Sequence, residues 1–219
     1  GRGRADAHLI EPTRRMLRLL DRYGARLTLF AEAGEIMRFR DHRDATGRDD
    51  YHLDGVAAQL RGALAAGHDV QLHLHASYFQ AVHEQGYWQQ DYSAHDLALL
   101  PYARQVDLLA RAKGFLEHLL EPERPDYRCR VFRASNWSMQ PTSGIARALR
   151  ANGLEIDSSV WKHGQFDYPV RFDYRGAHSA LIPWPIDDDD VCRLDQHGGL
   201  FEVPIYSELQ PVWRFMSSH

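Results

Sequence analysis

The sequence predicts a single α/β domain, residues 1–219, built from mostly parallel strands with helices around them. The length of 219 residues suits one domain with a sizeable core. Hydrophobic residues make up 44% of the chain and aromatic residues 11%, which is typical of a folded globular protein. Short apolar runs that favour strands alternate with longer segments of helical periodicity. This alternation indicates parallel strands joined by right-handed helical crossovers.

The first half of the chain shows the order helix, strand, helix, strand. Apolar residues recur at helical spacing over 12–24, from a proline at the start to a glycine at the end. The apolar run 26–30 predicts a buried strand, and the charged run 38–50 predicts a loop. A second helix is expected over 56–67, ended by its glycine, and residues 70–75 predict the next strand.

The second half continues the alternation after a long insertion. Residues 78–93 are polar and aromatic without a clear period, which predicts a loop bordering a site. Two further helices and four further strands are expected, the helices at 97–120 and 142–151 and the strands at 129–133, 154–160, 180–182 and 200–205.

Charge and composition argue against several classes of partner. The formal charge of -4, with both signs interspersed, provides no basic field for nucleic acid or anionic lipid. No window approaches the ~20 apolar residues of a membrane span. Residues 1–6 carry no apolar signal-peptide core, so a cytoplasmic location is expected. Cys129 and Cys192 are too few for a disulfide scaffold.

Polar residues at the carboxyl ends of parallel strands gather at one mouth, where ligands bind. Three segments qualify, at 73–77, 133–137 and 157–159. His73 and His75 point to the same side of their strand because successive side chains alternate. Two neutral imidazoles there suit a divalent metal such as zinc, with a carboxylate and a water completing the shell. The alternative is that both are partly buried polar side chains without a ligand.

Several motifs then resemble those of NodB-type polysaccharide deacetylases, carbohydrate esterase family four. Gly-His-Asp-Val-Gln-Leu-His at 67–73 looks like the start of the family's second motif. The helix before residue 24 and Leu-Thr-Leu-Phe at 27–30 are similar to the family's preceding helix and strand. Phe-Arg-Ala-Ser-Asn-Trp at 132–137 resembles the third motif, Arg-x-Pro-x-Tyr. The segment 153–160 resembles the strand with the fourth motif's aspartate, and 198–205 a later strand.

This resemblance implies a distorted (β/α) barrel that binds one divalent metal, usually zinc. The implied reaction removes an N-acetyl group from an amino sugar in a polysaccharide or its precursor, for instance during assembly of a bacterial surface polysaccharide. His73 takes the place of the family's first metal histidine. The second should lie four residues later, where this chain has Ser77, so either Ser77 or His75 is expected to complete the set.

The resemblance also assigns catalytic positions. Arg133 would orient the catalytic aspartate, and Trp137 would offer its backbone N–H to the oxyanion. Asp157 would support Arg133 and stay ionised because it faces the guanidinium. The expected contacts with the sugar are Tyr78, Trp88 and Asn136.

Two family motifs have no counterpart here. The Asp-Asp pair that supplies the base and a metal ligand belongs before the first helix, where Asp6 is the sole aspartate. The final Leu-x-His is not evident. The leading interpretation is therefore a metal-dependent sugar N-deacetylase. The alternatives are a non-catalytic, deacetylase-like glycan-binding domain and an amidohydrolase-type metal hydrolase, although that family places its His-x-His on the first strand.

Overall fold

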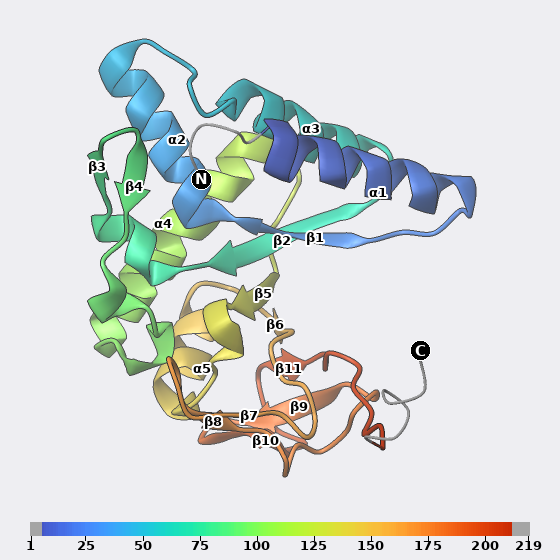
Figure 1. The fold of residues 1–219 in the computed structure, drawn as a ribbon. Coiled ribbons are helices and arrows are strands. Elements are labelled where there is room, and N and C mark those ends of the chain that lie inside the picture. Colours follow the sequence, from blue (N-terminus) through green and yellow to red (C-terminus); the bar gives the residue numbers. More distant parts are fainter. Residues whose placement is uncertain (1–5, 212–219) are drawn as a thin grey trace.

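The computed structural model describes residues 6–211, and its framework is a seven-stranded sheet with helices packed against it (Figure 1). Residues 1–5, on which the cytoplasmic prediction largely rests, and residues 212–219 lie outside the described part. The strands, in their order across the sheet, are β1 (Thr28–Glu32), β2 (Asp69–Leu74), β5 (Val131–Ala134), β6 (Ile156–Asp157), β11 (Phe201–Glu202), β9 (Trp184–Asp187) and β10 (Asp190–Leu194).

The first five strands of this order are parallel to one another. Strand β9 then pairs antiparallel with β11, and β10 pairs antiparallel with β9. The prediction of a mixed α/β fold with mostly parallel strands is confirmed. Over the described residues the sheet is not closed, with β1 at one edge and β10 at the other. The structure is compatible with a distorted barrel, which remains a prediction.

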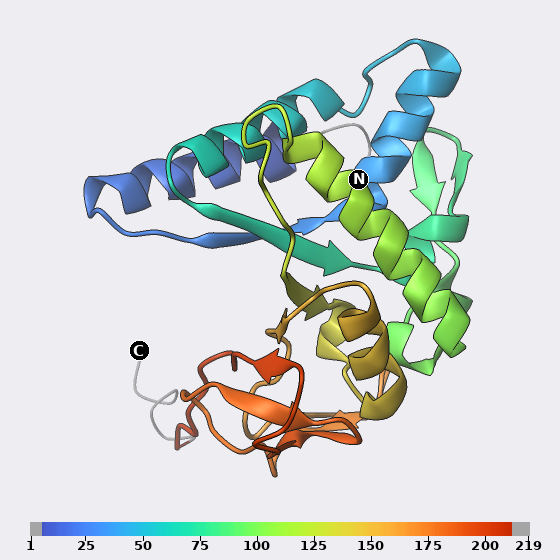
Figure 2. The same ribbon diagram turned by 180° about the vertical axis from the view of Figure 1, so that it is seen from behind.

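Five α-helices in residues 6–211 accompany the sheet, and three of them pack against β2. These are α2 (Ala33–Thr46), α3 (Leu53–Ala65) and α4 (Tyr102–Leu120), while α1 (Glu11–Arg22) lies beside α3 and α5 (Thr142–Ala151) packs against α4 (Figure 2). Two small hairpins stand apart from the main sheet, β3 (Val82–Glu84) with β4 (Tyr87–Gln89) and β7 (Gln165–Phe166) with β8 (Phe172–Asp173). None of the helices in residues 6–211 is long and apolar enough to cross a bilayer.

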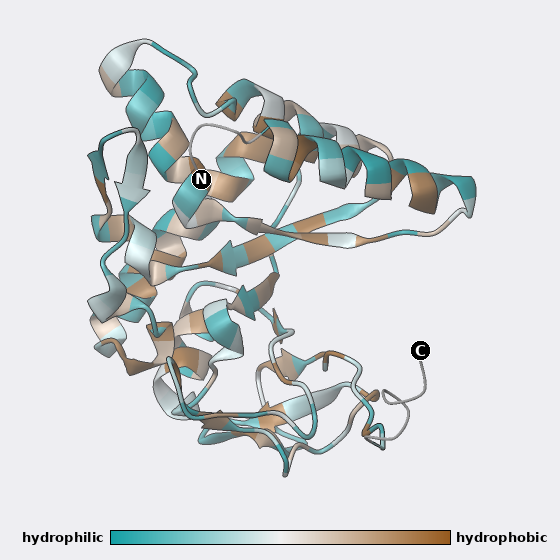
Figure 3. Ribbon diagram, in the orientation of Figure 1, coloured by the Kyte–Doolittle hydropathy of each residue, from teal (hydrophilic) through white to brown (hydrophobic). Residues whose placement is uncertain are grey.

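Strand β2 shows how the sequence positions the site. Val70, Leu72 and Leu74 are fully buried in the core, whereas His73 is only partly buried. Apolar and polar residues alternate along this strand (Figure 3). Because side chains alternate between the two faces, burying the leucines on one face leaves His73 on the other.

The charged run 38–50, predicted to be a loop, forms most of α2 instead. The Glu32 side chain caps this helix by accepting a hydrogen bond from Gly34 N at 2.9 Å, and Gly47 ends it at a φ of 70°. The buried face of this helix includes Ile36 and Met37, which precede the charged run, and Phe39 within it. Those apolar residues are buried, while most of the charged residues are not. Packing of the apolar face against the core therefore stabilises a helix here rather than a loop.

Other expected elements differ in extent. Helix α4 begins at Tyr102 rather than at residue 97, because Pro101 disfavours a helical residue before it. The expected strand at 180–182 is absent, since the Ser179 hydroxyl accepts the backbone N–H groups of Leu181 and Ile182 and turns the chain. The expected loop 78–93 contains the β3–β4 hairpin. By contrast, α5 has the predicted bounds.

Candidate metal centre

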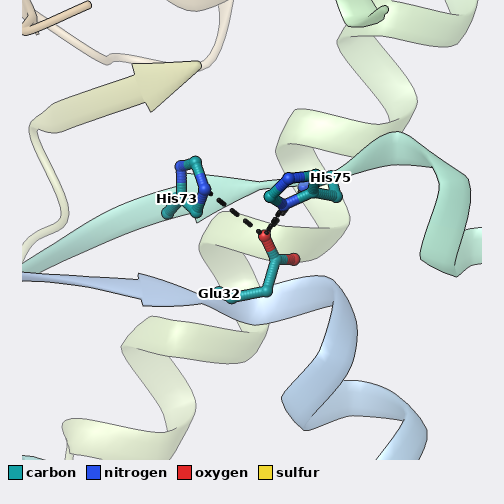
Figure 4. Close-up of side chains that lie close together, drawn as sticks. All are labelled: Glu32, His73 and His75. Atoms are coloured by element: carbon teal, nitrogen blue, oxygen red, sulfur yellow. Dashed lines mark hydrogen bonds and ion pairs between the residues drawn. The ribbon is translucent and has the colours of Figure 1, made fainter. Parts of the chain in front are cut away.

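The carboxyl ends of β1 and β2 bring one carboxylate and two imidazoles together. In the parallel register of these strands Glu32 lies opposite His73, and His75 follows on the same side of β2 (Figure 4). One ligand atom from each of the three residues lies within 4.8 Å of the other two. No other trio of His, Cys, Asp or Glu in residues 6–211 comes so close.

The Glu32 carboxylate is held at both oxygens. Its Oε1 accepts the N–H of Gly34, while Oε2 lies 2.6 Å from His75 Nδ1 and accepts the His75 backbone N–H at 2.9 Å. The same Oε2 lies 3.9 Å from His73 Nε2. The two imidazole rings stand nearly perpendicular, with centroids 4.8 Å apart. The carboxylate therefore has a defined position between two imidazoles.

His73 is oriented by the backbone of the neighbouring strand. Its Nδ1 lies 2.8 Å from the carbonyl oxygen of Arg133. A carbonyl only accepts hydrogen bonds, so Nδ1 carries the proton and Nε2 keeps its lone pair, directed to the Glu32 side. Burial lowers the pKa of His73, although the charge of Glu32 opposes this. The neutral form that metal binding requires is thus favoured.

This donor set fits a divalent transition metal. Two neutral imidazoles and one carboxylate form a common set for catalytic zinc, which leaves a further coordination position open to water or substrate. The three side chains are a third exposed or less, so a ligand can reach them without leaving them fully solvated. The prediction of a metal site is supported to this extent, and zinc as the metal stays a prediction.

A cavity of about 600 Å³ opens beside the trio, within the size range of small-molecule sites. Glu32 and His75 form part of its wall. Glu35 lies one helical turn after Glu32 and lines the same cavity, where burial raises the pKa of its carboxyl. The remaining wall includes the polar and aromatic side chains of Ser77, Tyr78, Gln90, Tyr92, Asn136 and Tyr168.

Of the three residues predicted to bind metal, the structure brings two together and places the third elsewhere. His73 and His75 both belong to the trio. Ser77 is buried in the short helical turn after β2, and its hydroxyl donates to Gln90 Oε1 at 2.7 Å. The Ser77 oxygen lines the cavity but is engaged elsewhere, so of the two alternatives His75 is the better placed.

The predicted sugar contacts divide similarly. Tyr78 and Asn136 line the cavity, and Asn136 adopts a left-handed backbone with a φ of 51°. Such backbone strain in a non-glycine residue often occurs at functional sites. Trp88 is not part of this wall. It packs in the β3–β4 hairpin against the His83 ring, at 4.9 Å between centroids, with the Arg38 guanidinium 5.8 Å above it.

The catalytic predictions need one correction. Arg133 donates to the Ser158 carbonyl at 2.7 Å and to the Ser158 hydroxyl at 2.9 Å, and not to Asp157. Asp157 is fully buried, and burial raises the pKa of its carboxyl, which works against the ionised form expected beside Arg133. Trp137 is 42% exposed next to Asn136, with a φ of 57°. Its role at an oxyanion stays a prediction.

Sequence reasoning missed Glu32 and Glu35. Glu32 ends the strand predicted at 26–30, so it stands at the carboxyl end of a parallel strand, where site residues gather. That signal was available. The expected position of the family's Asp-Asp motif pointed instead to Asp6, which lies in the turn before α1 and lines a separate groove against α3.

Comparison with known protein families, curated proteins and solved structures finds no match to this chain.

Proposed function

We propose that the chain is a metal-dependent hydrolase whose divalent metal, zinc in our proposal, is held by Glu32, His73 and His75. The convergence of these three donors beside an open cavity carries the proposal. The metal would supply Lewis acidity and a bound water of lowered pKa. The chain itself contributes the fixed carboxylate, the oriented His73 and the walls that confine the substrate.

Glu35 is the proposed proton-transfer group. Its carboxyl lines the cavity at the next turn of α2 and interacts with the Tyr78 hydroxyl. Burial raises the pKa of Glu35, which brings it nearer to the pH at which a general acid or base works well. In this proposal it takes over the proton transfer that the family's first-motif aspartate performs.

The proposed substrate is an N-acetylated amino sugar within a polysaccharide or its precursor. Three tyrosines, Tyr78, Tyr92 and Tyr168, line the cavity and suit the apolar faces of sugar rings. Gln90 and Asn136 provide amide groups for hydroxyl and acetamido substituents. The motif resemblance along the chain supports the same substrate class, although fold alone does not determine function.

A non-catalytic glycan-binding role is the second candidate. This role is favoured by Ser77, which occupies the place of the family's second metal histidine. The Ser77 hydroxyl donates a hydrogen bond to Gln90. An amidohydrolase-type enzyme is less well supported, because β1 precedes the histidine-bearing strand β2 in the chain.

Zinc content and amine release from an N-acetylated chito-oligosaccharide separate the candidates. The wild-type protein should retain about one zinc per chain and release amine, whereas His73→Ala should lose both. His118→Ala is a matched control, since His118 is an exposed histidine on α4, and should behave as wild type. Glycan binding without zinc or amine release would leave only the binding role.

A further inference from the structure

Two buried carboxyl groups face each other on the neighbouring strands β6 and β11. Asp157 ends β6 and Glu202 ends β11, and the two residues are paired directly across these parallel strands. Both are fully buried. Buried carboxyl groups are rare unless each one has a partner that compensates its charge.

Each carboxyl has one oxygen in use and one left over. Asp157 Oδ1 accepts the Ser159 hydroxyl at 2.6 Å, and Glu202 Oε1 accepts the backbone N–H of Val160 at 3.0 Å. The other oxygens, Asp157 Oδ2 and Glu202 Oε2, are buried and have no N–H or O–H donor among the described residues. The two carboxyl groups interact with each other. Two ionised carboxylates cannot form that contact, because neither has a hydrogen to donate.

We infer that Asp157 and Glu202 share one proton, and that this acid pair positions the end of β5 against which His73 is oriented. A single proton between Oδ2 and Oε2 satisfies both leftover oxygens. The pair then carries one negative charge in place of two, as in other carboxyl pairs that share a site.

The surrounding charges agree with one negative charge. Arg133, on β5, interacts electrostatically with both carboxyls, and its single positive charge balances a singly ionised pair. Tyr174 also faces both carboxyls, but burial raises the pKa of its phenol, which therefore stays neutral. If both carboxyls ionised, the core would hold an unbalanced negative charge, which is strongly unfavourable.

A chain of hydrogen bonds connects the pair to the candidate metal centre. The Ser159 hydroxyl that donates to Asp157 also accepts the backbone N–H of Ala134 at 2.8 Å. Ala134 follows Arg133, whose carbonyl accepts from His73 Nδ1. Glu202 is thus a positioning residue, separated from the imidazole by Asp157, Ser159 and the peptide group that joins Arg133 to Ala134. This positioning role rests on the proposed metal-binding function, whereas the shared proton does not.

Infrared difference spectroscopy of the metal-free protein at pH 7 tests whether Asp157 and Glu202 share a proton. The spectrum of the wild type minus that of Glu202→Gln should contain the C=O band of a neutral carboxylic acid, because the amide removes the need for the proton. Asp157→Asn should lose the same band. Glu155→Gln, an exposed glutamate on the approach to β6, should not. A wild-type spectrum without this band in the difference overturns the inference, whether or not the protein binds zinc.

Chelator competition tests the positioning role. Glu202→Gln should bind zinc within about twofold of wild type, because its amide N–H can replace the shared proton. Glu202→Ala should bind about tenfold more weakly, the effect typical of groups that orient a metal ligand. Ser159→Ala cuts the link to Ala134 without changing any charge and should also lose about tenfold. Equal affinity in Ser159→Ala and wild type would overturn the positioning role, even if Glu202→Ala failed to fold.

Discussion

Replacing Glu32 by Gln removes the negative charge of the candidate metal centre and keeps the size of the side chain. Zinc binding at four-ligand protein sites has an apparent free energy of about 10–16 kcal/mol. One ligand in four therefore accounts for about 2.5–4 kcal/mol. At about 1.4 kcal/mol per tenfold change, Glu32→Gln should weaken zinc binding by about 10²–10³.

The same substitution should cost only modest stability. The amide oxygen of the substituted side chain can still accept the Gly34 N–H that begins α2. What is lost is the anionic acceptor for the backbone and ring nitrogens of His75. Hydrogen bonds to charged groups contribute about 1.5–3 kcal/mol, so the free energy of unfolding should fall by about 2 kcal/mol.

Zinc affinity by chelator competition, measured on folded protein, is the assay. Glu35→Gln provides the matched control, because it neutralises a carboxylate on the same helix that lies outside the trio. It should keep zinc affinity within about threefold while reducing amine release by about 10²–10⁴, the usual contribution of a general acid or base. If Glu32→Gln also kept wild-type zinc affinity, Glu32 would not be a metal ligand.

Three further predictions follow from the pKa shifts and the packing. Burial raises the pKa values of Asp157 and Glu202, so the native state holds a proton that the unfolded chain releases, and the unfolding free energy should fall with rising pH by up to about 1.4 kcal/mol per pH unit. Urea titrations between roughly pH 5 and 8 should show a flatter slope for Glu202→Gln, and an unchanged slope would contradict the shared proton. Ser77→His should destabilise the protein by about 1–3 kcal/mol without tighter zinc binding, because the site is buried, and a tenfold gain in zinc affinity would instead place Ser77 among the ligands. His95 lies 2.6 Å from the carbonyl oxygens of both Pro169 and Tyr92, which raise its pKa, so its hold on the segment at Pro169 should be complete below the ordinary histidine pKa and weaken as pH rises through the raised value. Hydrogen exchange near Pro169 should show this dependence in wild type and lose it in His95→Gln.

The predictability of each element followed the strength of its local signal. Helix α5 was predicted with its observed bounds because a glycine closes its apolar pattern. Helix α2 was missed because charged residues surround its apolar face, and only contact with the core distinguishes that face. The prediction of a strand at 180–182 was wrong for the opposite reason, because its local apolar signal was not matched by burial. Its apolar residues Leu181 and Ile182 are about two-thirds exposed, with no neighbouring strand to pair with.

The sequence by itself determined the alternation of strands and helices and the shared face of His73 and His75, because both depend on periodicities within one segment. Only the tertiary structure decided which carboxylate joins them. Glu32 lies forty-one positions before His73 in the chain and meets it through the register of β1 with β2. In the same way, Asp157 was identified from its own strand, but Glu202, which lies opposite it on β11, was not. A side chain's neighbours across a sheet depend on strand order, which no local pattern encodes.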